Sequence, residues 1–155
     1  MVEIKNILFP TDFSEHSLLA LPIALDLAGR YGAALHCLHV IDWGQEFFLA
    51  RPYISPCPID EAAIQRSVEE QLCSFIQEQA LPSDLAIKRT VVQGKPFVEI
   101  IHYCRQEEID LIVLGTHGHS ALASMLLGSV TEKVVRKAPC AVLTVRHPEH
   151  RFQAP

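Results

Sequence analysis

Short apolar runs alternate along this chain with segments of helical periodicity, and this alternation limits the possible folds more than any other feature. Five runs rich in β-branched and aliphatic residues are predicted to be strands, at residues 4–9, 34–41, 85–92, 110–114 and 141–145. Such runs are typical of strands that are buried on both faces of a parallel sheet. Between them, apolar residues recur at helical spacing, which predicts helices within residues 18–28, 64–76, 97–104 and 130–138.

Residues that begin or end helices stand at the borders of these segments. Gly32 follows the first helical segment, and Pro139 follows the fourth. Asp60 can cap the second helix, and Pro96 suits the first turn of the third. Pro22 conflicts with the pattern, because a proline inside a helix removes a backbone hydrogen bond and bends the axis unless tertiary packing compensates. The alternation predicts an α/β sandwich with a parallel sheet and right-handed crossovers.

The composition excludes several classes of protein. The chain has 155 residues, of which 49% are hydrophobic, and this fits one globular domain. The formal net charge of -5 and the lack of a basic run argue against nucleic-acid binding, which requires clustered Lys and Arg. No run of about 18 apolar residues occurs, so neither a membrane span nor a secretory signal is predicted. The expected location is the cytoplasm.

Cysteine and histidine patterns do not indicate a metal centre. The cysteines are widely spaced, odd in number and without a CxxC pair, so they are interpreted as buried, reduced thiols. Two histidine pairs, His117-x-His119 and His147-x-x-His150, lack the Cys, Asp or Glu partners of a closed metal site. They are interpreted as histidines of a loop and of the C-terminal tail.

The longest irregular connection is predicted at residues 43–59, which contain three prolines and several aromatic residues. Long loops of this kind often serve as lids or binding surfaces. An aromatic-rich loop that packs on its own domain, or at a dimer contact, is an equally good interpretation.

The stretch GTHGHSALASMLLGS follows the fourth predicted strand and carries the strongest indication of a binding site. Gly115 and Gly118 lie just past the end of that strand, where glycines let backbone N–H groups approach an anion. Gly128 and Ser129 then open the last helix, whose first N–H groups have no partner inside the helix. The two glycine pairs together predict a cradle for phosphate groups.

Each part of this stretch also has an explanation that needs no ligand. Ser129 can form a capping box with Glu132, so that the serine serves only its own helix. Gly115 can end the strand in a plain turn.

The loop after the first predicted strand offers a second candidate. In open parallel sheets, ligands bind at the carboxyl ends of the strands, where a carboxylate commonly meets a ribose hydroxyl or a metal–phosphate group. Asp12 is placed for this role, with Ser14 as the cap of the following helix. The alternative is that Asp12 is itself the N-cap, with Glu15 at the third helical position.

Several longer stretches accompany the glycine pattern: ILFPTDFSE, LHVID, QGKP, GSVTEKVV and APCAVLTVR. With them, residues 4–146 resemble a universal stress protein of the nucleotide-binding branch. The hallmark of that branch is G-x-x-G, nine residues, and then G-S or G-T. Gly115, Gly118, Gly128 and Ser129 match it position for position.

The resemblance implies one domain at residues 1–147, followed by a C-terminal tail at 148–155. It implies an open, parallel five-stranded sheet in the order 3-2-1-4-5 with helices on both faces, similar to the adenine nucleotide alpha hydrolases. In this order, strands 1 and 4 are neighbours, and the loops that follow them flank one crevice. The resemblance further implies a homodimer that pairs through the last strand, residues 141–145.

The resemblance also implies that the crevice holds ATP. The residues implied around the adenosine are Pro10, Thr11, Asp12 and Val40. Those implied around the ribose and phosphates are Gly115, His117, Gly118, His119, Gly128, Ser129, Val130 and Thr131. Asp12 is the carboxylate available for a Mg²⁺ or Mn²⁺ ion that accompanies the phosphates. Many relatives carry Arg or Lys at the position of His119, so phosphate affinity is expected to fall as pH rises and the imidazole loses its charge.

The motifs of common nucleotide-processing enzymes are missing. Neither a P-loop, nor G-x-G-x-x-G, nor a nucleophile elbow occurs. A cradle of backbone N–H groups binds ground and transition states alike, and only a metal on Asp12 offers rate acceleration. The predicted function is an ATP-binding stress-response regulator with at most slow, metal-assisted hydrolysis. The alternative is a dimeric interaction protein of the same fold with an empty crevice.

Overall fold

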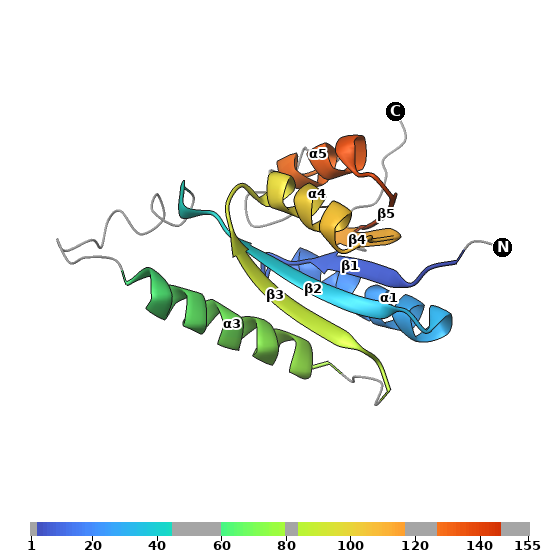
Figure 1. The fold of residues 1–155 in the computed structure, drawn as a ribbon, viewed down its shortest axis with the longest axis horizontal. Helices are drawn as coiled ribbons and strands as arrows, with labels where there is room; N and C mark the ends of the chain where they lie inside the picture. The colour runs from blue at the N-terminus through green and yellow to red at the C-terminus, as the bar shows by residue number, and fades with distance from the viewer. Residues whose placement is uncertain (1–2, 45–59, 80–83, 117–126, 147–155) are drawn as a thin grey trace.

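A computed structural model describes residues 3–44, 60–79, 84–116 and 127–146, and its centre is a parallel five-stranded sheet (Figure 1). The strand order is β3-β2-β1-β4-β5, and each neighbouring pair runs parallel. This confirms the expected fold class and strand order. The strands are β1 Asn6–Pro10, β2 Ala34–Ile41, β3 Ile87–Gln93, β4 Leu111–Gly115 and β5 Ala141–Val145.

Helices cover both faces of the sheet, and each face has its own hydrophobic cluster. The helices are α1 Glu15–Tyr31, α3 Glu61–Gln77, α4 Pro96–Gln106 and α5 Ser129–Lys137. Buried residues of α1 and α3 pack on one face, around Ile7 and Phe9 of β1. Buried residues of α4 and α5 pack on the other, around Leu8 and Ile112. Each fully buried side chain of this size contributes about 1.5–3 kcal/mol to folding. Among the residues described, no helix has the length and apolar character that crossing a membrane requires.

The helix ends confirm most of the capping expectations. The Asp60 side chain accepts a hydrogen bond from the amide of Ala63, and Pro96 lies in the first turn of α4. Gly32 ends α1 in the left-handed conformation at φ 62°, which glycine adopts without steric cost. Pro22 does not end α1, which continues to Tyr31. Pro22 lies on the exposed side of that helix, and burial of the opposite side offsets the missing hydrogen bond.

The edge strands are more exposed than the sequence pattern predicts. Residues of β1, β2 and β4 are almost all buried, as expected of a parallel sheet. The expectation of burial on both faces is wrong for β3 and β5. These two strands have only one neighbour each, so Lys88 and Arg89 of β3 reach solvent, and Leu143 of β5 is 38% exposed.

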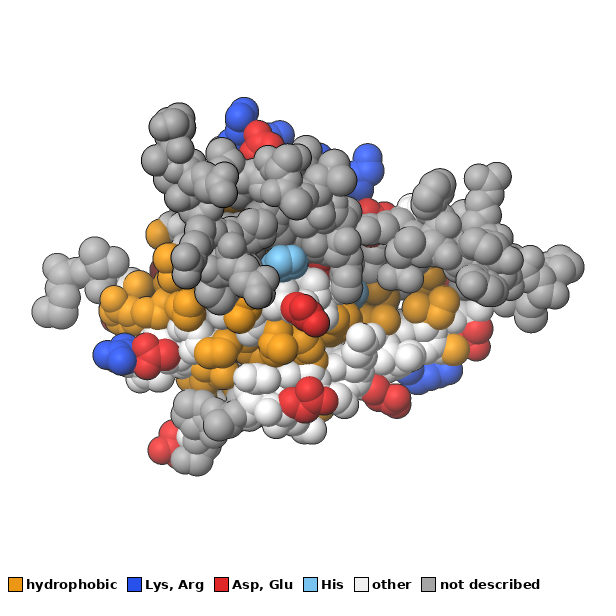
Figure 2. Space-filling model, turned by 180° about the vertical axis from the view of Figure 1, so that it is seen from behind, with side chains coloured by type: hydrophobic (Ala, Val, Ile, Leu, Met, Phe, Trp, Pro, Cys, Tyr) orange, Lys and Arg blue, Asp and Glu red, His pale blue; other side chains and the backbone are white. Residues whose placement is uncertain are grey.

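The surface on the far side of Figure 1 carries a band of hydrophobic side chains (Figure 2). The exposed large hydrophobic residues of α1 are Leu18, Ile23 and Tyr31, with exposed fractions of 37%, 38% and 52%. Exposed apolar side chains are common on protein surfaces, so we assign no role to these three residues.

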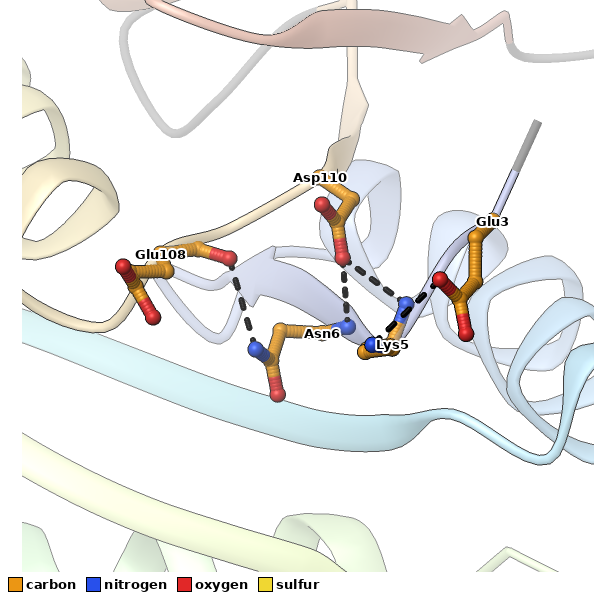
Figure 3. A network of polar contacts seen from close by, with 5 residues as sticks. All are labelled: Glu3, Lys5, Asn6, Glu108 and Asp110. Atoms are coloured by element: carbon orange, nitrogen blue, oxygen red, sulfur yellow. Dashed lines mark hydrogen bonds and ion pairs between the residues drawn. The ribbon is translucent and has the colours of Figure 1, made fainter.

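A polar network at the amino ends of β1 and β4 holds these two strands together (Figure 3). Oδ2 of Asp110 accepts hydrogen bonds from the backbone amides of Lys5 and Asn6, at 2.8 and 2.9 Å. The amide of Asp110 donates in turn to the carbonyl of Asn6 at 2.9 Å, and Asn6 Nδ2 donates to the Glu108 carbonyl at 3.3 Å. These bonds lie just before Ile7 and Leu111, the first residues that pair between the two strands. The pair of strands that should flank the crevice is therefore fastened at its opposite end.

Candidate functional site

The start of α5 is joined directly to the end of β4. The amide of Gly128 donates a hydrogen bond to the carbonyl of Thr116 at 2.7 Å. Oγ1 of Thr131 donates to the carbonyl of Gly115 at 2.9 Å, and the side chain is buried. These two bonds bring Gly115 next to Gly128, although twelve residues separate them in the sequence.

Among the residues that the structure describes, the N-cap position of α5 carries no capping side chain. Its N-cap is Gly128, with an extended ψ of 155°, and the first bond inside the helix runs from the Glu132 amide to the Gly128 carbonyl at 2.9 Å. The capping-box explanation of Ser129 is therefore wrong. Ser129 is already the first helical residue, one position too late to cap, and Glu132 forms an ion pair with Arg136 at 3.0 Å. Helix geometry leaves the N–H groups of residues 129–131 without partners inside the helix, and the dipole there favours an anion.

Thr11 follows β1 and is held from several sides. Its amide donates to the carbonyl of Leu38 at 2.9 Å, which extends the pairing of β1 with β2. Its Oγ1 accepts from the amide of Phe13 at 3.0 Å and lies 2.9 Å from Ser17 Oγ. Ser17 donates its own hydroxyl proton to the Ser14 carbonyl, so the Thr11 hydroxyl donates to Ser17. Thr11 is only 6% exposed, and its hydroxyl serves the loop.

Asp12 is not the N-cap of α1. That position belongs to Ser14, whose Oγ accepts from the Ser17 amide at 3.2 Å. The explanation of Asp12 as a helix cap is therefore wrong, because it lies two residues before the capping position. Its Oδ1 accepts a hydrogen bond from the Ser14 amide at 3.0 Å, which closes a local turn and leaves the carboxylate half-buried.

The predicted site residues fall into three groups by exposure. Pro10, Thr11, Gly115 and Thr131 are buried, whereas Asp12, Val40, Gly128 and Val130 are half-buried and Ser129 is exposed. Pro10 to Asp12 follow β1, and Gly115 ends β4, so both sets lie at the carboxyl ends of neighbouring strands. Val40 lies near the end of β2, opposite Val92. His117, Gly118 and His119 lie outside the described residues, as do residues 45–59 of the long connection.

Sequence reasoning assigned no role to two residues that hold the Thr11 loop. His39 of β2 places Nδ1 2.9 Å from the carbonyl of Thr11. The ring of Phe13 stacks on the ring of His39 with a centroid distance of 4.3 Å and an angle of 16°. The signal available in the sequence was the pair of histidines, His36 and His39, inside a strand whose other residues are apolar.

Three buried groups with shifted pKa values lie within β2 and α4. Burial raises the pKa of the Cys37 and Cys104 thiols to about 12, and lowers the pKa of His36. Cys37, Cys73, Cys104 and Cys140 are free thiols, and Cys57 lies outside the described residues. The described part of the chain contains no group of three or more His, Cys, Asp or Glu side chains that could hold a metal ion. Both histidine pairs lie outside that part.

Comparison with known proteins identifies the family. The model of the universal stress protein family matches residues 3–146. The chain belongs to the universal stress protein family. Universal stress protein MJ0577 of Methanocaldococcus jannaschii is 33% identical over 156 residues, covering 92% of this chain and 94% of the relative. Universal stress protein YxiE of Bacillus subtilis is 32% identical over 151 residues, covering 92% and 99%.

Solved structures of universal stress proteins share the fold. UspA from Lactobacillus plantarum superposes with a TM-score of 0.70 at 30% identity, covering 94% of this chain and 100% of UspA. The structure of MJ0577 gives a TM-score of 0.71 at 29% identity, covering 96% and 99%. A universal stress protein in complex with cAMP gives 0.64 at 23% identity, covering 94% and 98%, which shows the fold alone.

Proposed function

We propose that this universal stress protein binds an adenine nucleotide, ATP in the first instance, at the carboxyl ends of β1 and β4, and acts as a cytoplasmic stress-response regulator. The observation that carries the proposal is the amino end of α5, whose N-cap Gly128 offers no capping side chain and which Gly128 and Thr131 hold against the end of β4. A protein of this fold has been crystallised with cAMP, which is also an adenine nucleotide.

The residues present fit an anionic ligand. The N–H groups of residues 129–131 oppose negative charge together with the helix dipole. Gly128 has no side chain to cover them, and the exposed hydroxyl of Ser129 can donate to a phosphate oxygen. Gly118 and the two histidines beside it would complete the cradle, as the family motif implies.

Asp12 and Val40 are proposed to contact the ligand from the carboxyl ends of β1 and β2. The half-buried Asp12 carboxylate can accept from a ribose hydroxyl or hold a Mg²⁺ or Mn²⁺ ion on the phosphates, and Val40 offers an apolar contact for the adenine. A bound ion would neutralise phosphate charge. Thr11 and Thr131 act differently, because their hydroxyls bond to the protein and shape the two turns.

A homodimer through β5 is the second element of the proposal. β5 is an edge strand of the sheet, and an edge presents unpaired backbone groups that favour pairing with another chain. Leu143 on this strand is 38% exposed in the single chain. The same observation favours the alternative function, a dimeric interaction protein that needs no nucleotide.

Two measurements distinguish a nucleotide-binding regulator from an interaction protein that needs no nucleotide. Nucleotide released from freshly purified, denatured protein is identified by mass, and ATP affinity is then titrated for the wild type, Ser129→Asp and Ser129→Asn. An aspartate in the first helical turn favours the helix, yet it repels phosphate, so Ser129→Asp is expected to lower ATP affinity by at least about tenfold. Ser129→Asn has similar size without charge and should bind within about threefold of the wild type. Equal affinity of the aspartate variant would show that the phosphates lie elsewhere.

A further inference from the structure

We infer that His39 positions the nucleotide indirectly. It does so by fixing the conformation of the loop that carries Asp12. This inference rests on the proposed function. It adds a residue that the glycine motif does not contain and names the two contacts through which that residue acts.

The first contact is a hydrogen bond from β2 to the loop. His39 is 9% exposed, and its Nδ1 lies 2.9 Å from the carbonyl oxygen of Thr11. A carbonyl can only accept a hydrogen bond, so Nδ1 carries the proton and donates it. The amide of Thr11 meanwhile donates to the carbonyl of Leu38, the residue before His39. Two consecutive residues of β2 therefore hold both backbone polar groups of Thr11.

The second contact supports a strained backbone. Phe13 has φ of 62°, in the left-handed region that residues with a Cβ rarely adopt. Its ring stacks on His39 at 4.3 Å and meets the edge of Phe75 of α3 at 5.5 Å and 69°. Aromatic contacts of this kind stabilise the ring position and so offset the strain. Without them, the loop would relax toward ordinary backbone angles.

Asp12 lies between these two held residues. Thr11 is fixed by its bonds to β2, and Phe13 is fixed by its ring contacts and by its amide bond to Thr11 Oγ1 at 3.0 Å. These restraints, together with its bond to the Ser14 amide, contribute to the position of the Asp12 carboxylate. We therefore expect loss of the His39 donor to shift Asp12, while the groups proposed to touch the ligand stay chemically unchanged.

The same strand supplies a matched control. His36 is slightly more buried than His39, with exposed fractions of 5% and 9%, and it also uses Nδ1 for a hydrogen bond. Its partner is the hydroxyl of Tyr103 on α4, at 3.1 Å, on the opposite face of the sheet. Replacement of His36 removes a buried imidazole and a hydrogen bond but leaves the Thr11 loop in place.

The test compares ATP affinity and amide exchange in the full chain of the wild type, His39→Leu, His39→Asn and His36→Leu. Asn places an N–H donor near the position of Nδ1, whereas Leu fills similar space without one. We expect His39→Leu to lower ATP affinity about tenfold and to speed hydrogen exchange at the Phe13 amide, and His39→Asn to restore most of both. His36→Leu is expected to lose stability but to keep its affinity.

Each other result overturns the inference. A folded His39→Leu protein that binds ATP as the wild type does, or an Asn variant as weak as the Leu variant, refutes the role of the His39 donor and leaves the proposed function standing. A wild type that binds no adenine nucleotide refutes the proposed function and the inference with it. If His39→Leu does not fold, Phe13→Ala carries the test, because Ala lacks the ring and keeps the cost of positive φ. Wild-type affinity in that variant would also refute the inference.

Discussion

The hydroxyl of Thr131 donates a 2.9 Å hydrogen bond to the carbonyl of Gly115, across a sequence separation of 16 residues. Through this bond, the first turn of α5 is fastened to the last residue of β4. Both residues are buried, so no solvent competes for the carbonyl.

Thr131→Val is expected to destabilise the protein by about 1–3 kcal/mol, because it leaves a buried carbonyl without its donor while it keeps the size of the side chain. It should also weaken ATP binding, since the helix end is no longer held at the strand. Urea unfolding and an ATP titration measure the two effects. Thr131→Ser keeps the hydroxyl and is the control. A valine variant with unchanged stability would show that the bond is replaced by another contact.

Asp110→Ala is expected to lower the free energy of unfolding by about 1–3 kcal/mol. One carboxylate oxygen accepts from the amides of both Lys5 and Asn6, and bonds to a charged acceptor are stronger than neutral ones. Glu3→Ala is the matched control, because the ion pair of Glu3 with Lys5 at 3.3 Å joins two mostly exposed side chains and contributes little. Urea unfolding compares the two variants. Equal losses would mean that the network has no special role.

The alternation of apolar runs and helical segments was enough to predict an α/β sandwich with a parallel sheet, because each strand is a short apolar run and each helix repeats apolar residues at helical spacing. The strand order was implied only by the resemblance to the universal stress proteins. Gly32 and Asp60 also predicted their helix ends correctly, since capping depends on local geometry alone. Strand exposure was predicted less well. An apolar run such as that of β5 looks the same at the edge of a sheet as in its middle, and only the strand order distinguishes the two.

The candidate site was predictable only in part. The glycine motif indicated a helix end that can bind an anion. For Ser129 and Asp12, however, the sequence also allowed capping roles, and the structure excludes these because the N-caps are Gly128 and Ser14. The bonds of Asp110, His39 and Thr131 join residues that lie far apart in the chain, and no local pattern announces such partners.

We expect the buried imidazole of His36 to make the protein less stable in mild acid. Burial lowers the pKa of His36. The positive charge of Lys88 lowers this pKa further, whereas the negative charge of Glu107 raises it. The unfolded imidazole has a pKa of about 6.5, so below that pH the unfolded state binds more protons than the folded state. The contribution of neutral His36 to the free energy of unfolding is therefore complete above about pH 6.5. It is lost as the pH falls toward the lowered pKa of the folded state.

His36→Gln should remove this part of the acid dependence, although it will cost stability at neutral pH by disturbing the bond to Tyr103 at 3.1 Å. Urea unfolding of both proteins at several values between about pH 5 and pH 7 gives the two slopes. The wild type is expected to show the steeper fall. Parallel curves would mean that His36 contributes nothing to the acid sensitivity.

Leu143→Lys tests the proposed pairing through β5. A lysine on an edge strand opposes edge-to-edge association, because pairing would bury its charge or bring it against its copy. Ile23→Lys on α1 is the control, since Leu143 and Ile23 are both 38% exposed and only one lies on the edge strand. Sedimentation should show a wild-type dimer, a monomer for Leu143→Lys and an unchanged dimer for Ile23→Lys. A monomer for Ile23→Lys alone would place the contact on α1, and a monomeric wild type would remove the dimer from the proposal.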